Sequence, residues 1–307
     1  MKLVAIIIAF FSLTAYAQVD QEQFKSWHKK TRIQNYEISY VDHGEGKPIV
    51  LFHGIPTSSW MYRNIIPKLA SLGYRVIAPD MLGMGASQIN NVPNYSLSLE
   101  NQSKILSELI TNKLGIKHFS AIVHDFGGPI LWDMLGHSEI AIDNMIILNT
   151  FAFKQGWNHG YNFMTRQLMN LATTPLTDKM FFQSAIRSMI DNPGQFKEDE
   201  LESIIEGYVN PLIKGAGRTY KVLYYSVKSI ENNMLSKFQQ NLLKIDPKTV
   251  TLIWGENDKF LSSSKQVEQF KNHLQLHSDQ VYIINEAKHL ILEDQFEQTY
   301  KIIKDKL

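Results

Sequence analysis

IVHDFGGPIL, residues 122–131, joins an apolar run of strand length to an apolar helical pattern. A sharp strand-to-helix turn of this kind is typical of a nucleophile elbow, where small residues surround one reactive side chain. Asp125 stands at the position of that side chain, between Val123 and Gly127. Pro129 then falls in the first helical turn, where its missing N–H costs no hydrogen bond. Taken alone, the turn fits equally well an aspartate that only caps the helix, since Asp is a favoured N-cap residue.

Strand-length apolar runs alternate with helical stretches on both sides of this turn. Two strands are predicted within residues 36–54, and others at 74–80, 119–125, 144–149, 249–255 and 280–285. Helices are predicted at 59–72, 97–114, 127–136 and 290–307. Continuous Val, Ile and Leu strands separated by helices predict an α/β fold, with a mostly parallel sheet that helices cover on both faces.

The alternation stops between residues 150 and 246, where the sequence is mostly helical and interrupted by prolines. The simplest architecture is an α/β core, residues 18–149 and 247–307, with a helical cap, residues 150–246, inserted after the sixth strand. A ligand pocket is expected between the cap and the edge of the sheet where the strands end.

Composition narrows the possible functions. The 307 residues are 44% hydrophobic, enough for a large core, and carry a formal charge of +1. Balanced charge gives no footprint for nucleic acid or an anionic membrane surface, so the expected partner is a small molecule. Residues 1–17 combine a lysine, an apolar run and small residues, which predicts a cleavable signal peptide, no membrane span, and a periplasmic or secreted protein. The chain has no cysteine, which excludes disulfides.

Two residues late in the chain could complete a catalytic set with Asp125. An elbow nucleophile requires an acid and then a histidine, each at the end of a strand. Asp258 and His289 each follow a predicted strand, in that order. The backbone N–H groups of Ile55 and Phe126 are candidates for an oxyanion hole, since one donor usually follows the nucleophile and another lies in the loop of an early strand.

Four stretches carry a resemblance to a known family: FHGIPTSSWMYRNIIPKLASLGYRVIAPDMLGMGAS, VHDFGGPI, WGENDKF and AKHLILED. They resemble the α/β-hydrolase superfamily, specifically its branch of haloalkane dehalogenases and epoxide hydrolases. The resemblance covers nearly all of the chain after residue 17, including the cap stretch YVNPLIKGAGRTYKVLYYSVKSI. It implies that Asp125 is the nucleophile, His289 the base and Asp258 the acid that orients His289.

The chemistry of a carboxylate explains an aspartate in place of a serine. With a reference pKa of about 4 it is ionised at neutral pH and needs no base to attack a saturated carbon. The product is an ester on Asp125, which water activated by His289 would hydrolyse. Some relatives place the acid after the sixth strand, but Asn149 stands there, which favours Asp258. The resemblance implies no cofactor and no metal.

Other polar residues of the matching stretches are interpreted as structural. His53 and His124 are expected to support loops through hydrogen bonds. Asp80, within APDMLGMG, is expected to fix a loop rather than to take part in the reaction.

Two departures from the family concern the leaving group. Many dehalogenases hold the departing halide with a tryptophan directly after the nucleophile, where this chain has Phe126, and with a side chain at the position of Ile55. Trp157, early in the cap, is a candidate substrate-binding N–H donor, with buried packing as the alternative. Epoxide hydrolases instead use cap tyrosines as acids, and the candidates here are Tyr161, Tyr208, Tyr220, Tyr224 and Tyr225.

Three hypotheses remain open on the sequence alone. The preferred one is a haloalkane dehalogenase-like hydrolase that acts on a small apolar molecule and water. An epoxide hydrolase is the alternative. The third, a ligand-binding protein that keeps the fold without catalysis, conflicts with the complete set of Asp125, Asp258 and His289. Oligomeric state is not encoded in any recognisable pattern.

Overall fold

The computed structural model describes residues 19–87, 97–156, 175–213, 218–230 and 234–307. The predicted signal peptide and Trp157 lie outside the described residues. Within them, no helix combines the length and the apolar character that crossing a bilayer requires.

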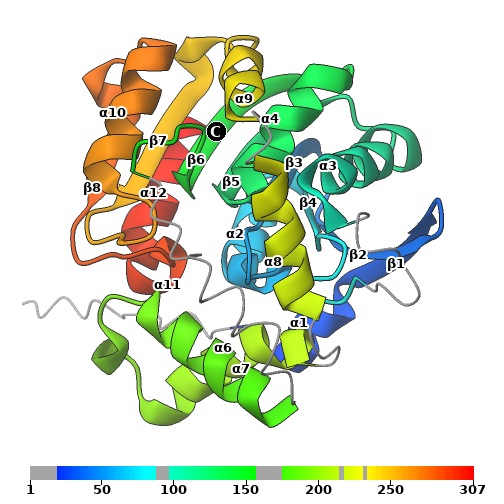
Figure 1. Cartoon of the computed structure of the whole chain (residues 1–307), viewed down its shortest axis with the longest axis vertical. Helices are drawn as coiled ribbons and strands as arrows, with labels where there is room; N and C mark the ends of the chain where they lie inside the picture. Colours follow the sequence, from blue (N-terminus) through cyan, green and yellow to red (C-terminus); the bar gives the residue numbers. More distant parts are fainter. Residues whose placement is uncertain (1–18, 88–96, 157–174, 214–217, 231–233) are drawn as a thin grey trace, which may run out of the picture.

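An eight-stranded sheet forms the centre of the molecule, in the order β1-β2-β4-β3-β5-β6-β7-β8 (Figure 1). The strands are β1 (His28–Ile33), β2 (Tyr36–His43), β3 (Lys47–Phe52), β4 (Tyr74–Pro79), β5 (His118–Asp125), β6 (Ala141–Thr150), β7 (Val250–Gly255) and β8 (Val281–Ile284). β2 runs antiparallel to both β1 and β4, and every other pair is parallel. The mostly parallel sheet predicted from the sequence is confirmed.

Helices flank the sheet on both faces. One group is α3 (Leu99–Ser107), α4 (Gly127–His137), α9 (Leu235–Leu242) and α10 (Ser263–Leu274); the other is α2 (Ile65–Ser71) and α12 (Phe296–Lys306). Within the first group, α4 packs against α3 and α9. In the second, the Lys68 ammonium lies over the rings of Phe296 and Tyr300. This layering accounts for the continuous apolar strands, which are covered on both sides.

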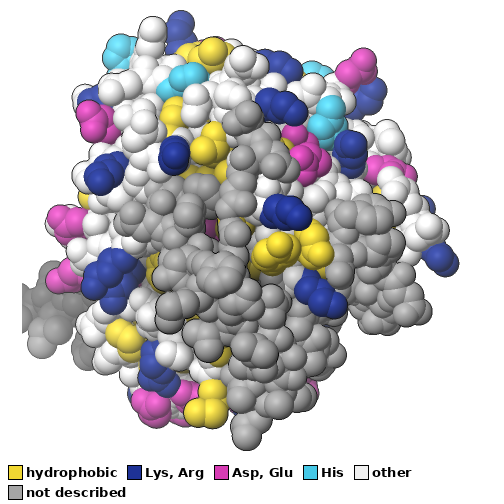
Figure 2. Space-filling model, in the orientation of Figure 1, with side chains coloured by type: hydrophobic (Ala, Val, Ile, Leu, Met, Phe, Trp, Pro, Cys, Tyr) yellow, Lys and Arg dark blue, Asp and Glu magenta, His cyan; other side chains and the backbone are white. Residues whose placement is uncertain are grey.

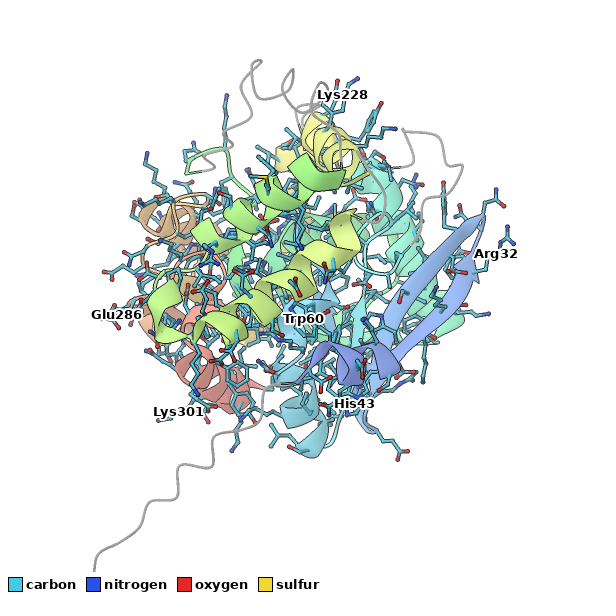
Figure 3. All side chains as sticks on the ribbon, turned by 90° about the horizontal axis from the view of Figure 1, so that it is seen from below. Arg32, His43, Trp60, Lys228, Glu286 and Lys301 are labelled. Atoms are coloured by element: carbon cyan, nitrogen blue, oxygen red, sulfur yellow. The ribbon has the colours of Figure 1, made fainter. Side chains whose placement is uncertain are left out.

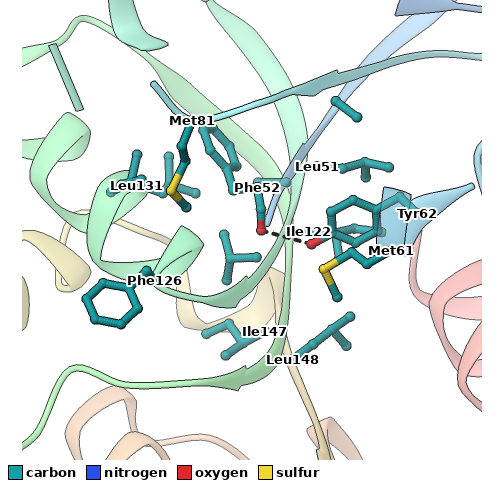
Figure 4. Packing of buried hydrophobic residues seen from close by; sticks show 14 of the residues in the cluster. Leu51, Phe52, Met61, Tyr62, Met81, Ile122, Phe126, Leu131, Ile147 and Leu148 are labelled. Atoms are coloured by element: carbon teal, nitrogen blue, oxygen red, sulfur yellow. Dashed lines mark hydrogen bonds between the residues drawn. The ribbon is translucent and has the colours of Figure 1, made fainter. Parts of the chain in front are cut away.

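The centre of the sheet forms the main core. Figure 4 shows Phe52, Ile122 and Ile147, from three neighbouring strands, among the packed side chains. All three are buried. The Tyr62 hydroxyl enters the same cluster and donates to the Phe52 carbonyl at 2.8 Å, so its polar atom is satisfied inside the core.

Helices follow β6 before the chain returns to the sheet at β7. They are α6 (Pro175–Ser188), the short η4 (Pro193–Gln195), α7 (Glu198–Ile213) and α8 (Arg218–Ser229), and α6 and α7 occupy the lower part of Figure 1. The predicted helical insertion after the sixth strand is therefore present. Helix α9 lies against α4 of the core, where the Asn241 amide donates to the Trp132 carbonyl at 2.9 Å. The boundaries of the cap, residues 150 and 246, stay a prediction.

Several predicted elements differ in detail. The helix predicted at 59–72 is a 3-10 turn, η1 (Ser59–Tyr62), followed by α2. A continuous helix would place Pro67 in its interior, whereas a start at Ile65 leaves it in the first turn, where it needs no N–H partner. The helix predicted at 97–114 ends in a π-helical segment, η3 (Glu108–Lys113). Strand β1 and the helices α1 (Gln21–Ser26) and α10 were not predicted.

The last predicted helix, residues 290–307, is divided into α11 (Ile291–Asp294) and α12. The division falls at Gln295, whose φ of −136° and ψ of 61° are not helical. Short α11 thereby follows His289 directly and brings Glu293 and Asp294 into the interior.

Charges of both signs are interspersed on the face seen in Figure 2, with small apolar patches between them. Among the described residues of this face, no large area carries charge of a single sign, in keeping with the formal charge of +1.

Candidate active site

Asp125 ends β5 in a left-handed backbone conformation, with φ at +49°. Such a conformation is strained for a non-glycine residue and is held here by its surroundings. A Cβ on Gly54 would come within 2.3 Å of the Asp125 Cβ, and one on Gly127 within 2.2 Å of the Phe52 carbonyl oxygen. Val123, which replaces the first small residue of the usual motif, is fully buried in β5. The turn therefore needs glycine beside and after the aspartate but accepts valine before it.

The Asp125 carboxylate does not cap α4. The N-cap of α4 is Phe126, and no side chain forms a cap hydrogen bond there. One oxygen, Oδ1, accepts the Ile55 N–H at 2.9 Å, and the other, Oδ2, lies 3.5 Å from His289 Nε2. The capping alternative left open by the sequence thus does not describe this residue.

His289 lies between two carboxylates. Its Nδ1 is 2.8 Å from Asp258 Oδ2, while its Nε2 faces Asp125. All three side chains are buried. The structure thus brings together three residues that are far apart in the sequence and that come from the ends of β5, β7 and β8. The N–H of Nδ1 donates to Asp258, which orients Nε2 toward the elbow.

Asp258 is held by donors on both oxygens. Its Oδ1 accepts the N–H groups of Phe260 and Leu261 at 2.8 and 3.0 Å, and its Oδ2 accepts the Asn149 amide at 2.7 Å. Burial would raise the pKa of Asp258, but the charge and hydrogen bond of His289 and the Asn149 amide hold it below its usual range. The carboxylate is therefore ionised in the folded protein.

Asn149 has a role that sequence reasoning did not assign. It stands at the position where some relatives carry the acid, and here it donates to Asp258. Its Oδ1 accepts the Gly255 N–H at 3.2 Å, and its backbone adopts a positive φ of 34°. Asparagine tolerates this conformation better than most residues, which is a signal that the sequence did contain.

The position of His289 between two anions changes its protonation. Burial alone would lower the pKa of His289, but the Asp258 charge and then the hydrogen bond with Asp125 raise it to about 10. The imidazole is therefore protonated at neutral pH while Asp125 is a free carboxylate. In that state Nε2 donates a proton and cannot accept one.

The two expected oxyanion donors, the Ile55 and Phe126 amides, differ in their contacts with Asp125. The Ile55 amide donates directly to Asp125 Oδ1, so it is already aimed at the carboxyl group. Phe126 adopts a helical conformation, with φ −61° and ψ −15°, and its ring packs edge-on against Phe151 at 5.2 Å. The role of the Phe126 amide stays a prediction.

The polar residues interpreted as structural do hold loops. His53 Nδ1 donates to the Gly54 carbonyl at 2.7 Å, and its Nε2 accepts the Met81 N–H at 3.0 Å. Asp80 accepts the N–H groups of Ser59 and Ala86 at 2.9 and 2.8 Å. Burial lowers the pKa of His53, which keeps the ring neutral as these bonds require.

His124, directly before Asp125 in β5, supports the backbone of His289. Its Nε2 donates to the His289 carbonyl at 2.8 Å, and the two rings lie 4.6 Å apart. Burial and the charge of His289 lower the pKa of His124 to about 4, so this ring is neutral beside the charged one.

Most side chains expected to donate a hydrogen bond to the leaving group lie outside the described residues or donate to other groups. Trp157, Tyr161 and the Tyr220 side chain lie outside the described residues. The Tyr208 hydroxyl donates to Glu293 at 2.5 Å. Three other tryptophans give their N–H groups to backbone carbonyls: Trp60, Trp132 and Trp254. Among the described residues, no three His, Asp or Glu side chains are grouped to hold a metal ion.

The α/β hydrolase fold family model matches residues 47–180. A cis-3-alkyl-4-alkyloxetan-2-one decarboxylase from Shewanella oneidensis is 25% identical over 273 residues, which is 87% of this chain and 84% of the relative. A soluble epoxide hydrolase from Corynebacterium sp. is 33% identical over 40% of this chain and 41% of its own length. Haloalkane dehalogenase 2 from Mycobacterium tuberculosis is 32% identical over 37% of this chain and 38% of its own length.

Among solved structures, an α/β hydrolase fold protein from Burkholderia ambifaria superimposes with a TM-score of 0.72 at 21% identity. The match covers 90% of this chain and 97% of that one. The likeness to it therefore extends over the core and the helices between β6 and β7.

Proposed function

The chain belongs to the α/β-hydrolase superfamily, and from this premise we propose that it is a hydrolase whose nucleophile is the Asp125 carboxylate. The observation that carries the proposal is the placement of His289 Nε2 3.5 Å from Asp125 Oδ2 and Nδ1 2.8 Å from Asp258. A serine hydrolase would need a hydroxyl at the elbow. An ionised carboxylate there suits attack on a saturated carbon that bears a leaving group.

In the first step, an oxygen of Asp125 forms a bond to the substrate carbon while the bond to the leaving group breaks. The leaving group departs with the bonding electrons, and an ester remains on the enzyme. Esterification removes the negative charge that faced His289 Nε2. The pKa of His289 then falls, and the imidazolium releases its proton to solvent or to the leaving group.

In the second step, neutral His289 takes a proton from water, and the hydroxide attacks the carboxyl carbon of Asp125. The Ile55 amide, which donates to Oδ1 in the resting enzyme, is placed to stabilise the oxyanion that forms. Collapse of this intermediate expels the alkoxide, which takes the proton back from His289. Release of the alcohol leaves Asp125 as a carboxylic acid, whose proton passes to His289 Nε2, and this restores the carboxylate and the imidazolium of the resting site.

The substrate class follows from what can stabilise the leaving group. A haloalkane remains a candidate, because Trp157 stands early in the cap sequence and offers an N–H. An epoxide needs an acid for the developing alkoxide, and the resting imidazolium of His289 is one available proton donor. A haloalkane would give an alkyl ester and then an alcohol, and an epoxide would give a hydroxyalkyl ester and then a diol.

A second candidate is a strained cyclic ester, which one relative and the chemistry of its leaving group favour. The relative matched over 84% of its length is named as a decarboxylase of cis-3-alkyl-4-alkyloxetan-2-ones. Asp125 would attack the saturated ring carbon that is bonded to the ring oxygen, and the ring would open to release a carboxylate. This leaving group is a stable anion and needs neither a halide site nor an acid. Loss of CO₂ would then form a C=C bond and expel the Asp125 carboxylate, so that the products are an alkene and CO₂.

Intact-protein mass spectrometry of a His289→Phe variant tests the proposal, because hydrolysis stops and the ester should accumulate. With a bromoalkane, the protein mass should increase by the mass of the bromoalkane minus that of HBr. With an epoxide or an oxetan-2-one, it should increase by the whole mass of the substrate. The lactone adduct forms only if decarboxylation is slower than mixing, so CO₂ and alkene are measured in parallel with wild-type protein. Asp125→Asn is the matched control and should carry no adduct. Folded protein that neither carries an adduct nor turns over any of the three classes would contradict the proposal.

A further inference from the structure

The segment that carries His289 is held from its outer side by residues that follow α6. The Leu290 N–H donates to the Met189 carbonyl at 3.1 Å. The Asp191 N–H donates to Asp294 Oδ1 at 2.7 Å. These bonds fix the residues after the base against the helical insertion, although the two segments are about a hundred residues apart in the chain.

One side chain of α7 adds a direct link to the same segment. The Tyr208 hydroxyl donates to Glu293 Oε1 at 2.5 Å, and Glu293 also forms a two-point pair with Arg63 at 2.6 and 2.8 Å. Tyr208, Arg63 and Glu293 are all buried. Glu293 lies in α11, one turn after His289. The carboxylate thus joins three segments: α7, η1 and the end of the loop that carries the base.

Close packing on Trp60 fixes where α7 lies. The Trp60 indole N–H donates to the Ile204 carbonyl at 3.2 Å. A Cβ on Gly207 would come within 2.2 Å of the indole ring, so at this position α7 lies against the ring with its backbone. The Arg63 guanidinium lies 4.5 Å from the centre of the same ring. Figure 3 shows Trp60 beneath the cap helices. Tyr208 is therefore presented to Glu293 by a helix with a fixed position.

We propose that Tyr208 is a positioning residue for His289 and acts through Glu293. This inference rests on the proposed function of His289 as the base. Loss of the hydroxyl leaves Glu293 with Arg63 alone and releases α7 from α11. The loop with the imidazole then gains freedom, whereas Asp125 remains fixed on the elbow by Gly54 and Gly127. Attack by Asp125 should therefore continue, while activation of water, which depends on the placement of His289 Nε2, should slow.

Rapid-mixing experiments with 1-bromohexane on Tyr208→Phe separate the two steps. Bromide release in the first turnover is expected within about twofold of the wild type, and ester hydrolysis slower by about tenfold, because small displacements of a base are costly. Glu293→Gln removes the charge that faces both Tyr208 and Arg63 and should slow hydrolysis at least as much. Adding Tyr208→Phe to it should change little, since Tyr208 acts through Glu293. Equal slowing of both steps, or additive effects of the two variants, would overturn the inference.

Tyr62→Phe is the matched control. It deletes another buried phenol hydroxyl, whose hydrogen bond goes to the Phe52 carbonyl rather than to Glu293. It should lower the free energy of unfolding as Tyr208→Phe does, yet leave the ratio of the two rate constants unchanged.

Hydrogen–deuterium exchange tests the coupling without any substrate. Tyr208→Phe should raise exchange at least threefold in peptides covering both 204–212 and 287–294, and Tyr62→Phe should not. Unchanged exchange at 287–294 would overturn the inference even in an active enzyme. Faster exchange at 287–294 in a protein that forms no ester would keep the coupling but refute the proposed function.

Discussion

Replacing Asp125 with asparagine should lower the pKa of His289 from about 10 to roughly 7. In the wild type, the imidazolium lies between Asp258 and Asp125. The substitution removes one of these charges and keeps the size of the side chain. It also reproduces the electrostatic state of the ester, in which residue 125 is neutral.

The magnitude follows from one distance. His289 Nε2 and Asp125 Oδ2 are 3.5 Å apart. With an effective dielectric constant of ~20, two unit charges at this separation attract by about 5 kcal/mol. That energy corresponds to a factor of somewhat more than a thousand in the proton-binding constant. Asp258 still favours the charged imidazole in the variant, which keeps its pKa above the value that burial alone would give.

Titration of the imidazole NMR signals is the assay, with the His289 signal assigned by its loss in His289→Phe. Asp42→Asn is the control, because Asp42 pairs with Arg75 and Lys29 at the surface and should leave His289 unchanged. A wild-type pKa near 6.5 would show that the two carboxylates do not hold the charge on His289. A value that stays near 10 in Asp125→Asn would show that Asp125 has no part in it.

Four further outcomes are expected. The stability that the protonated His289 contributes is complete below pH 6.5, its ordinary pKa, and is lost as pH rises to about 10, which urea unfolding at several pH values would reveal. Arg63→Met leaves the Glu293 charge buried beside Tyr208 alone and should cost ~3–5 kcal/mol in the same assay; a loss below 1 kcal/mol would contradict a buried pair. Gly54→Ala should abolish the mass adduct in folded protein, because its Cβ meets Asp125; an ordinary adduct would refute this steric argument. Asn149→Ala removes a donor from Asp258 and should slow hydrolysis about tenfold, equivalent to one buried hydrogen bond of ~1.4 kcal/mol, with bromide release unchanged.

The sequence predicted the parts of the fold and site that rest on local patterns. Asp125, Asp258 and His289 each stand at the end of an apolar strand, and parallel strands bring such ends to one edge of a sheet. The need for Gly127 was readable from the elbow motif, because a Cβ there would strike the Phe52 carbonyl of the neighbouring strand β3. The superfamily resemblance and the α/β sheet followed from the same residues.

Contacts between distant segments were not predictable in this way. Nothing local in the sequence pairs Tyr208 with Glu293, since the contact depends on how α7 packs on Trp60. The polar strand β1 lacks the apolar run that identified the others, because it lies at the edge of the sheet and pairs only with β2. The supporting role of Asn149 was missed because its side chain acts on a residue more than a hundred positions later.

In the proposed mechanism, the two carboxylates around His289 impose an order on the two steps. While Asp125 is ionised, His289 holds a proton and cannot activate water, so a water molecule in the resting site meets no base. Formation of the ester removes the charge at 3.5 Å and leaves Asp258 alone to hold the proton. The base therefore becomes competent only when there is an ester to hydrolyse. A neutral serine at the elbow would not produce this order of steps, because it carries no charge to lose. In the proposed mechanism, the aspartate at residue 125 thus has two functions in one side chain: it attacks the substrate, and its neutralisation releases His289 to act as the base in the second step.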